Sequence, residues 1–273
     1  MPCWRNNEAE FAGGPGTPDA TFPSVHTLVL NLGNTSLTGG IFTGGRLVRR
    51  FRVPAREAVT AAGFARLVAP RMTGPIERAV LCSVVPALTS KLLRLIERHC
   101  RVKPRVLTVN AAHGLTIGYR RPGELGTDRL AAALGAQVLF CRQNVIVVDC
   151  GTATTVTALS ATGCVEGGAI LPGYGLWAEM LAGRTAQLPR IGGDVPRRAL
   201  GRGTRDGIAS GLHFGHIGAV RELVVRIAGE TFGRKRFVIV GTGGNAARFA
   251  GANLFADIVP DLVLLGLHAF AHA

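Results

Sequence analysis

The sequence predicts an α/β protein made of two similar lobes with a cleft between them. An aliphatic run ends in Asn31-x-Gly33-Asn34-Thr35, and a second run ends in Asp149-x-Gly151-Thr152, 118 residues further on. Each turn is followed by further short strands and then by alternating helices and strands. The same pattern repeated at this spacing in a chain of 273 residues indicates two halves of ordinary domain size.

The first lobe is expected to begin with a strand that leads into the first turn. Thr43-Gly44-Gly45 is a hairpin signal between the next two strands, and Pro86 ends the fourth. Leu92 and Ile96 fall on one side of an amphipathic helix, and Asp128 is expected to be the N-cap of the last helix. The expected strands are 27–30, 41–42, 47–53, 76–85 and 106–109, and the expected helices are 58–69, 87–100 and 129–140.

The second lobe restarts at Asn144 with a strand meander, whose turns are Ala161-Thr162-Gly163 and Pro172-Gly173. A later apolar strand leads into the small residues Gly241-Thr242-Gly243-Gly244. The expected strands are 145–149, 154–159, 167–171 and 237–240, and the expected helices are 176–182, 208–230, a segment from 245 and 262–271. We therefore expect an N-terminal lobe at 25–143 and a C-terminal lobe at 144–273.

The first 24 residues do not continue either lobe. They are rich in Gly, Pro, Ala and Asn, and they include Glu8 and Glu10. The basic and apolar regions of a signal peptide are both missing. We interpret 1–24 as a disordered extension, or as the result of a start codon assigned too early.

Composition limits the partners and the compartment. Apolar residues make up 47% of the chain, but the longest apolar runs have strand length, so no membrane span is expected. The net charge is +14, yet the arginines are scattered and aromatic residues make up only 6%, which does not favour nucleic acid. A positive surface also suits anionic small molecules. The six cysteines show no CxxC pair and no metal spacing, so we expect reduced thiols in a cytoplasmic protein.

The two turns have the chemistry of a phosphate-binding site. Glycine lets the backbone approach a ligand closely, and small hydroxyl, amide and N–H groups suit phosphate oxygens or a hydrated metal. The first turn alone leaves an ordinary hairpin turn as an equal alternative. Asp149 ends an apolar strand, where a carboxylate needs a partner. The partner can be a cation, or the Asp149 side chain can form a turn by bonding its own backbone. The repetition favours a functional pair.

The stretch from Tyr119 to Arg129 has the most specific pattern. Gly126 allows close packing against a ligand, Arg129 offers a planar fork to a carboxylate or phosphate, and Tyr119 offers an aromatic wall. Asp128 can accept a proton from an attacking alcohol, or it can be no more than a helix cap. A helix N-terminus favours the charged carboxylate and so makes it a weaker base. Phosphoryl transfer tolerates a weak base because it depends more on positioning.

Three further segments carry weaker signals. Gly241–Asn245 can form a floor for an adenine or ribose near a helix N-terminus, or it can be a simple connection. The loop Gly183–Pro189 contains a hydroxyl at Thr185 but has no signal of its own. His213 and His216 lie three apart on an expected helix, where a structural role is favoured over a metal pair.

Together these segments resemble type III pantothenate kinases, a family of the actin/hexokinase superfamily. The Gly-Asn-Thr turn, Tyr119 with 126–129, 149–154 and 185–189 follow the family's order and approximate spacing between about Leu28 and Leu267. The resemblance implies two actin-like (ribonuclease-H-like) lobes around a nucleotide cleft. It also implies ATP-dependent phosphorylation of pantothenate to 4'-phosphopantothenate, the first step of coenzyme A biosynthesis. The implied enzyme is a homodimer that uses ATP, Mg²⁺ and a monovalent cation, K⁺ or NH₄⁺.

The resemblance also implies a role for each matching residue. ATP would be held by Thr152 and by Asn31, Leu32, Gly33, Asn34, Thr35, Ser36, Leu37 and Thr38. Pantothenate would be held by Tyr119, Gly126, Thr127, Asp128 and Arg129, with Thr185 reaching the pantothenate of the neighbouring subunit. Asp128 would accept the proton of the primary hydroxyl, and Asp149 would bind the monovalent cation.

The first turn departs from the family pattern, which has Asp where this chain has Asn31. An amide lacks the negative charge that helps to hold hydrated magnesium, although it still hydrogen-bonds a metal-bound water. We therefore expect weaker use of magnesium or ATP. Two alternatives stay open: a catalytically weakened relative with a regulatory or nucleic-acid-binding role, and a kinase of the same fold that acts on a sugar or an acetate-like acceptor.

Overall fold

The computed structural model describes residues 25–72, 74–192 and 195–273. By internal packing the described chain divides into two units. The first contains 25–115, 121–141 and 262–273, and the second contains 116–120 and 142–261. This grouping differs from the expected lobes at 116–120, 142–143 and the last helix. The lobes at 25–143 and 144–273 therefore stay a prediction. The extension expected at 1–24 lies outside the described residues.

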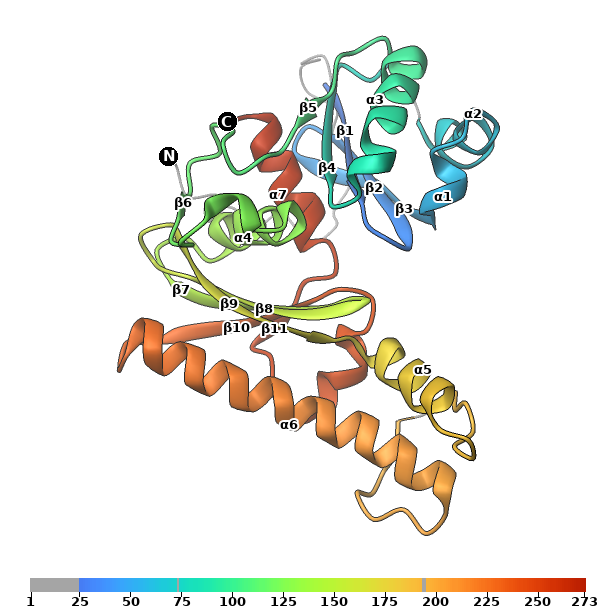
Figure 1. Ribbon diagram of the computed structural model, residues 1–273. Helices are drawn as coiled ribbons and strands as arrows, with labels where there is room; N and C mark the ends of the chain where they lie inside the picture. Colours follow the sequence, from blue (N-terminus) through green and yellow to red (C-terminus); the bar gives the residue numbers. More distant parts are fainter. Residues whose placement is uncertain (1–24, 73, 193–194) are drawn as a thin grey trace, which may run out of the picture. The chain divides into compact units, whose positions relative to one another are not determined.

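The first unit contains a five-stranded sheet with the order β3-β2-β1-β4-β5 (Figure 1). β1 is antiparallel to β2 and parallel to β4, so Asn31 lies between Thr38 and Cys82. The strands are β1 (His26–Leu32), β2 (Ser36–Thr43), β3 (Arg46–Pro54), β4 (Arg78–Ser83) and β5 (Arg105–Val106). The ends of β1 and β4 therefore meet at one edge of the sheet, where the first turn begins.

The alternation of side chains along β1 gives this sheet two buried faces. Leu28 and Leu30 join one core with side chains of the helices between β3 and β5, whereas Val29 and Leu264 both lie against Gly40 on the other face. The helical segments are α1 (Ala55–Ala58), α2 (Ala61–Gly63), η1 (Phe64–Val68), η2 (Ala69–Arg71), α3 (Pro86–Cys100), η3 (Pro122–Glu124), α4 (Thr127–Leu139) and α7 (Leu262–Ala271). Burial on both faces fixes the strand that carries Asn31.

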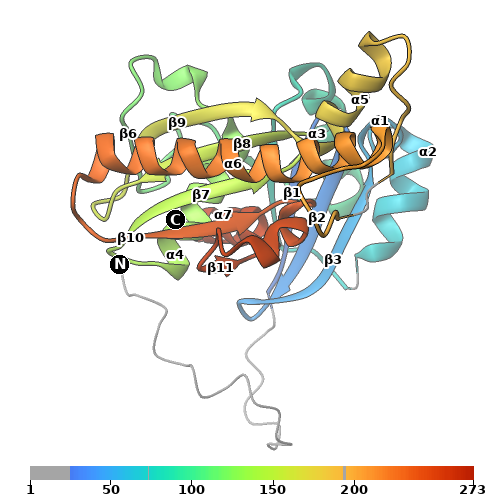
Figure 2. The same cartoon turned by 90° about the horizontal axis from the view of Figure 1, so that it is seen from below.

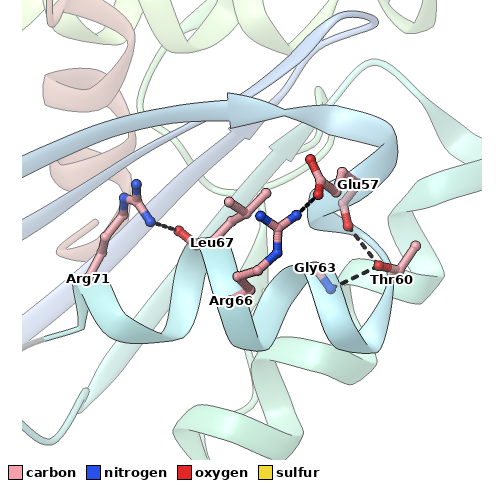
Figure 3. A network of polar contacts seen from close by, with 6 residues as sticks. All are labelled: Glu57, Thr60, Gly63, Arg66, Leu67 and Arg71. Atoms are coloured by element: carbon pink, nitrogen blue, oxygen red, sulfur yellow. Dashed lines mark hydrogen bonds and ion pairs between the residues drawn. The ribbon is translucent and has the colours of Figure 1, made fainter.

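The helix expected at 58–69 is divided into short helical pieces. The hydroxyl of Thr60 donates to the carbonyl of Glu57 at 2.9 Å and accepts from the N–H of Gly63 at 3.0 Å (Figure 3). Thr60 is therefore the N-cap of α2 and interrupts the helix that precedes it. Arg66 forms an ion pair with Glu57 across this break.

Helices α4 and α7 lie side by side in the first unit (Figure 1), and their backbones come unusually close. A Cβ atom on Gly135 would lie 2.1 Å from the carbonyl oxygen of Leu262. A Cβ atom on Gly266 would lie 1.8 Å from the carbonyl oxygen of Ala131. Glycine at both crossing points is what permits this approach. The pair fixes the direction of α4, whose first turn carries Asp128.

The second unit repeats the arrangement of the first sheet. Its order is β11-β10-β7-β8-β9-β6, and without β6 the neighbours and strand directions match those of β5-β4-β1-β2-β3. The strands are β6 (Thr116–Ile117), β7 (Asn144–Cys150), β8 (Ala153–Leu159), β9 (Cys164–Pro172), β10 (Phe237–Thr242) and β11 (Asp257–Ile258). The expected fold class is confirmed: the chain contains two ribonuclease-H-like sheets, as actin-like proteins do.

The long helix α6 (Thr204–Phe232) covers one face of the second sheet (Figures 1 and 2). Its side chains Leu212, Val220 and Val224 share a core with Ile146 and Val148 of β7. The other helical segments are α5 (Tyr174–Arg184) and η4 (Ala246–Ala252). Of the described helices, none combines the length and the apolar character needed to cross a membrane.

Local structure differs from the expectations at three places. The N-cap of α4 is Gly126 and not Asp128. The 3₁₀ helix η3 ends at Glu124 and α4 already begins at Thr127, so Asp128 lies inside the first turn, two residues after the cap. A helix does begin after Asn245, as expected, but it is a 3₁₀ helix, since Gly251 and the left-handed Asn253 disfavour an α-helix there. β6 and β11, of two residues each, were not expected because so short a run has no detectable period.

The cysteines differ in burial. Among the described residues, Cys82, Cys100, Cys150 and Cys164 are free thiols. Burial, with a smaller contribution from the Asp149 carboxylate, raises the pKa of Cys150 to about 12. Cys141, just after α4, is half-buried. Cys3 lies outside the described residues, so the expectation that all six thiols are reduced stays a prediction.

Mild acid is expected to destabilise the fold through its partly buried histidines. His268 of α7 stacks on Phe42 with ring centroids 4.2 Å apart. Burial, followed by the nearby His272 and Arg78, lowers the pKa of His268 to about 4. An unfolded histidine titrates near about 6.5, so as the pH falls the unfolded state takes up the proton first. The contribution of neutral His268 to stability is therefore complete above about pH 6.5. It is lost as the pH falls from there towards the folded pKa of about 4.

This prediction is checked by urea unfolding at about pH 7.5 and about pH 5.5, a window that lies above the usual carboxylate range. We expect a lower midpoint at the acid end for the wild type. His268→Phe keeps the stack on Phe42 and removes one titrating group, so its midpoint should fall less. An identical fall in both proteins would contradict the role given to His268.

Candidate functional site

In the first unit, hydrogen bonds hold the start of α4 against the end of β4. The Thr127 hydroxyl donates to the carbonyl oxygen of Ser83 at 3.0 Å, and the Cys82 thiol donates to the Thr127 hydroxyl at 3.3 Å. Burial raises the pKa of the Cys82 thiol far above its usual range, so the thiol keeps the proton that it donates. Because Cys82 pairs with Asn31 across β1 and β4, the start of α4 and the first turn share one edge of the sheet.

Asp128 is held in a defined orientation at this edge. Its Oδ1 accepts the N–H of Arg129 at 2.8 Å, and a Cβ atom on Gly126 would lie 2.7 Å from the same oxygen. Glycine at 126 therefore leaves room for the carboxylate. Arg129 is 7% exposed, so its guanidinium is less available to solvent than the sequence suggests.

The first turn offers both backbone and side-chain groups. The N–H of Gly33 donates to the carbonyl of Ser36 at 3.0 Å, which closes the turn and leaves Asn34 and Thr35 exposed. Leu32 and Leu37 are buried in the core, so only their backbone can serve a ligand. The Ser36 hydroxyl accepts from Arg52, and Thr38 is half-buried on β2 beside Asn31.

Asn31 is the most unusual of these residues. Its Oδ1 is buried and has no hydrogen-bond partner among the residues that the structure describes. A buried amide oxygen normally has a partner, and one without a partner needs an explanation. A bound water, or the water shell of a metal ion, is a chemically suitable partner for an amide oxygen.

In the second unit, two glycine-rich segments meet at Asp149. β7 and β10 run parallel with Asp149 opposite Thr242, and a Cβ atom on Gly243 would lie 2.2 Å from the Asp149 Oδ1. The N–H of Asn245 donates to the carbonyl of Cys150 at 2.9 Å. The 241–245 segment, a weak signal in the sequence, thus packs directly against the second turn. Within the described ranges, no group of three or more His, Cys, Asp or Glu side chains could hold a metal.

The start of α5 closes the other side of this turn. The N–H of Gly173 donates to the carbonyl of Thr152 at 2.9 Å, and a Cβ atom on Gly173 would lie 2.3 Å from the carbonyl oxygens of both Gly151 and Thr152. The Thr152 side chain is exposed. Sequence reasoning identified Pro172-Gly173 only as a turn, although a glycine between a strand and a helix was the available signal.

The remaining predicted residues, Tyr119 and Thr185, belong to the second unit. Tyr119 follows β6 in the second unit, half-buried, after Gly118 donates to the carbonyl of Val165 at 2.8 Å. Thr185 is the exposed C-cap of α5, and its hydroxyl donates to the carbonyl of Leu181 at 2.7 Å.

Cys82 and Ser83 were not recognised as site residues from the sequence. Both stand at the end of β4, immediately before a proline-started helix. The available signal was an aliphatic run that ends in two small polar residues, because Asn31 and Asp149 also stand at the ends of aliphatic runs.

Two ribonuclease-H-like sheets, each with a glycine-bearing turn, define the class of actin-like proteins. The family described as type III pantothenate kinase matches residues 27–226. The chain belongs to the type III pantothenate kinase family, and it is a kinase.

The relatives extend this match over nearly the whole described chain. Type III pantothenate kinase of Legionella pneumophila (strain Corby) is 36% identical over 249 residues, which cover 89% of this chain and 97% of that protein. Type III pantothenate kinase of Dehalococcoides mccartyi (strain CBDB1) is 36% identical over 250 residues, covering 88% and 93%. These relatives favour the kinase over the regulatory or nucleic-acid-binding alternative.

Solved structures support the fold alone. A Campylobacter jejuni protein of the Baf family of transcriptional activators superposes with a TM-score of 0.59 at 17% identity, covering 88% of this chain and 95% of that one. The ethanolamine utilization protein EutJ of Carboxydothermus hydrogenoformans gives a TM-score of 0.56 at 14% identity, covering 91% of each chain.

Proposed function

We propose that this chain transfers the γ-phosphoryl group of ATP to the primary hydroxyl of pantothenate, giving 4'-phosphopantothenate and ADP for coenzyme A biosynthesis. The observation that carries the assignment of residues is the anchoring of Thr127 to Ser83 and Cys82. This anchoring supports a reacting carboxylate, Asp128, at the strand edge where the first turn begins. Because the reaction consumes ATP, we assign it to the cytoplasm.

In this proposal the protein mainly positions the reactants. Asp128 accepts the proton of the pantothenate hydroxyl as that oxygen bonds to the γ-phosphorus, and the bond to the ADP oxygen breaks. The hydrogen bond from the Arg129 N–H fixes the direction of the carboxylate. Gly126, Thr127, Arg129 and Tyr119 hold the acceptor, whereas residues 31–38 and Thr152 hold the nucleotide. A loose transition state needs alignment more than a strong base.

Two cations complete the proposed site. Magnesium, when bound to ATP, neutralises phosphate charge, and Asn31 fits its hydration shell because the buried Oδ1 has no other partner among the described residues. The Asp149 carboxylate, packed against the glycine at 243, is the proposed ligand of K⁺ or NH₄⁺. A single carboxylate suits a singly charged ion better than a divalent one.

Asn31→Asp is expected to raise turnover at low magnesium. The new carboxylate adds negative charge beside the metal's water shell, so less magnesium should be needed for half-maximal rate, by roughly threefold to tenfold. The measurement is a magnesium titration of the rate at fixed ATP and pantothenate. Asn253→Asp, which makes the same charge change at the exposed end of η4, should leave the titration unchanged. No gain for Asn31→Asp at low magnesium would refute this account of Asn31.

The proposal includes a homodimer in which the partner subunit's Thr185 reaches the pantothenate site. An apolar groove of about 540 Å³ lies between α5 and α6, lined by Trp177, Met180 and Leu181 among others. Met180 is 52% exposed in the single chain. Such a groove is suited to a second copy that carries the same apolar helix.

We expect light scattering to give a mass near twice the 28.6 kDa of the chain. Met180→Lys places a charge in the groove and should shift the mass toward the monomer, with a loss of pantothenate turnover. Val225→Lys makes the same change at an exposed position of α6 outside the groove and should leave the mass unchanged. A monomeric wild type that is fully active would contradict the shared site.

The proposed reaction is tested by pantothenate-dependent release of ADP in a coupled assay with magnesium and potassium. A panel of sugars and acetate in place of pantothenate separates this reaction from that of another kinase with the same fold.

A further inference from the structure

A buried histidine lies close to the Asp149–Thr152 turn of the second unit, and the proposed mechanism does not use it. His216 of α6 is 1% exposed. Its Nε2 lies 3.1 Å from the hydroxyl oxygen of Thr154, which is itself fully buried. Thr154 pairs with Cys150 across β7 and β8. The imidazole therefore bonds to the strand that leaves the Asp149–Thr152 turn.

The same ring contacts the two other elements that enclose this turn. It stacks on Phe249 of η4, with centroids 5.0 Å apart and planes at 11°, and Trp177 of α5 meets it edge-on at 5.3 Å. The residues that precede η4 and α5 donate backbone hydrogen bonds to the carbonyls of Cys150 and Thr152. One side chain thus contacts β8, η4 and α5 together.

Packing alone does not require an imidazole at this position. The Nδ1 of His216 is buried and has no hydrogen-bond partner among the residues described. Burial lowers the pKa of His216, which keeps the ring neutral near neutral pH. A phenylalanine would keep the aromatic contacts without burying an unpaired nitrogen. The feature that only the polar ring supplies is the bond to Thr154.

We propose that His216 is a positioning residue that fixes the Asp149–Thr152 turn for nucleotide binding through its hydrogen bond to Thr154. The inference rests on the proposed function, because Thr152 is the residue expected to hold ATP. Without this bond, the turn is less firmly held against α5 and η4, and nucleotide binding weakens. Asp128, the proposed proton acceptor, belongs to the first unit and is not part of this turn, so the effect falls on the KM for ATP and not on kcat.

The test compares His216→Phe, Thr154→Val and His216→Gln by calorimetric binding of ADP and by steady-state kinetics. The first two remove the hydrogen bond, and we expect each to raise the ADP Kd and the ATP KM about threefold to tenfold, with kcat within about twofold. His216→Gln keeps a side-chain amide for Thr154 and should stay near the wild type. His213→Phe is the matched control, because His213 stacks on Phe249 at 5.9 Å and has no hydrogen bond to the turn in the described structure.

An ADP Kd for Thr154→Val equal to that of the wild type would overturn the inference, and so would a fall in kcat without a change in Kd. If His216→Phe fails to fold, Thr154→Val decides the question, since it removes the same bond and keeps the ring. A wild type that binds ADP but does not phosphorylate pantothenate contradicts the proposed function. In that case the comparison of ADP affinities still decides the role of His216.

Discussion

Asp128→Ala is expected to lower kcat by about a hundredfold to ten-thousandfold while ADP binding is retained. The carboxylate is the proposed acceptor of the pantothenate proton, and the bonds from Thr127 to Ser83 and from Arg129 to Asp128 hold it at the edge of the first sheet. None of the groups assigned to the nucleotide depends on this side chain. The measurement combines single-turnover rates with calorimetric binding of ADP.

Two further variants show whether the lost group is a base. Asp128→Asn keeps the shape and an oxygen that accepts from Arg129, so a similar loss of rate would indicate proton acceptance and not a change of structure. Glu124→Ala removes another carboxylate four residues earlier, which pairs only with the exposed Arg121 in the described structure. Its rate should equal that of the wild type. A near-normal rate for Asp128→Ala would remove Asp128 from the mechanism.

Gly266→Ala is expected to destabilise the protein by about 3 kcal/mol. The added methyl would lie 1.8 Å from the carbonyl oxygen of Ala131, and backbone on both sides prevents a local adjustment. Helices α4 and α7 must then separate, which disturbs the core against β1 and β4 and the first turn of α4 together. Urea unfolding measures the loss, and we expect kcat to fall as well because Asp128 shifts.

Gly229→Ala is the matched control. Gly229 lies in α6, is exposed and has open space where the methyl would go. The same substitution should stabilise the protein here by roughly 0.5–1 kcal/mol, since alanine is the better helix former. If Gly266→Ala left the unfolding midpoint unchanged, the close contact of α4 and α7 would not be the feature that fixes the start of α4.

Much of the fold was predictable because its signals are local. The aliphatic runs that end at Asn31 and Asp149 gave the central strands, and the closing helix at 262–271 was predicted with its correct bounds. What the sequence could not provide is which separate segments meet. The contact of α7 with α4 depends on two glycines more than 130 residues apart, and short strands such as β6 depend on a neighbour to pair with.

The site shows the same division between local and distant information. The turns and Asp128 were proposed as site residues because each motif is continuous in the chain. Cys82 and Ser83 were missed because their contribution is a pair of hydrogen bonds to Thr127, 44 or more residues away. Asp128 was expected to cap α4, but the cap is Gly126, and a shift of two positions along a helix changes the direction of a side chain.

The most direct test is mass spectrometry of the products formed by the purified chain from ATP and pantothenate, with magnesium and with or without potassium. We expect one phosphorylated pantothenate for each ADP, formed rapidly with potassium or ammonium and slowly without either. Potassium-independent product would contradict only the cation site at Asp149. ADP formed without phosphorylated pantothenate would contradict the proposed function itself.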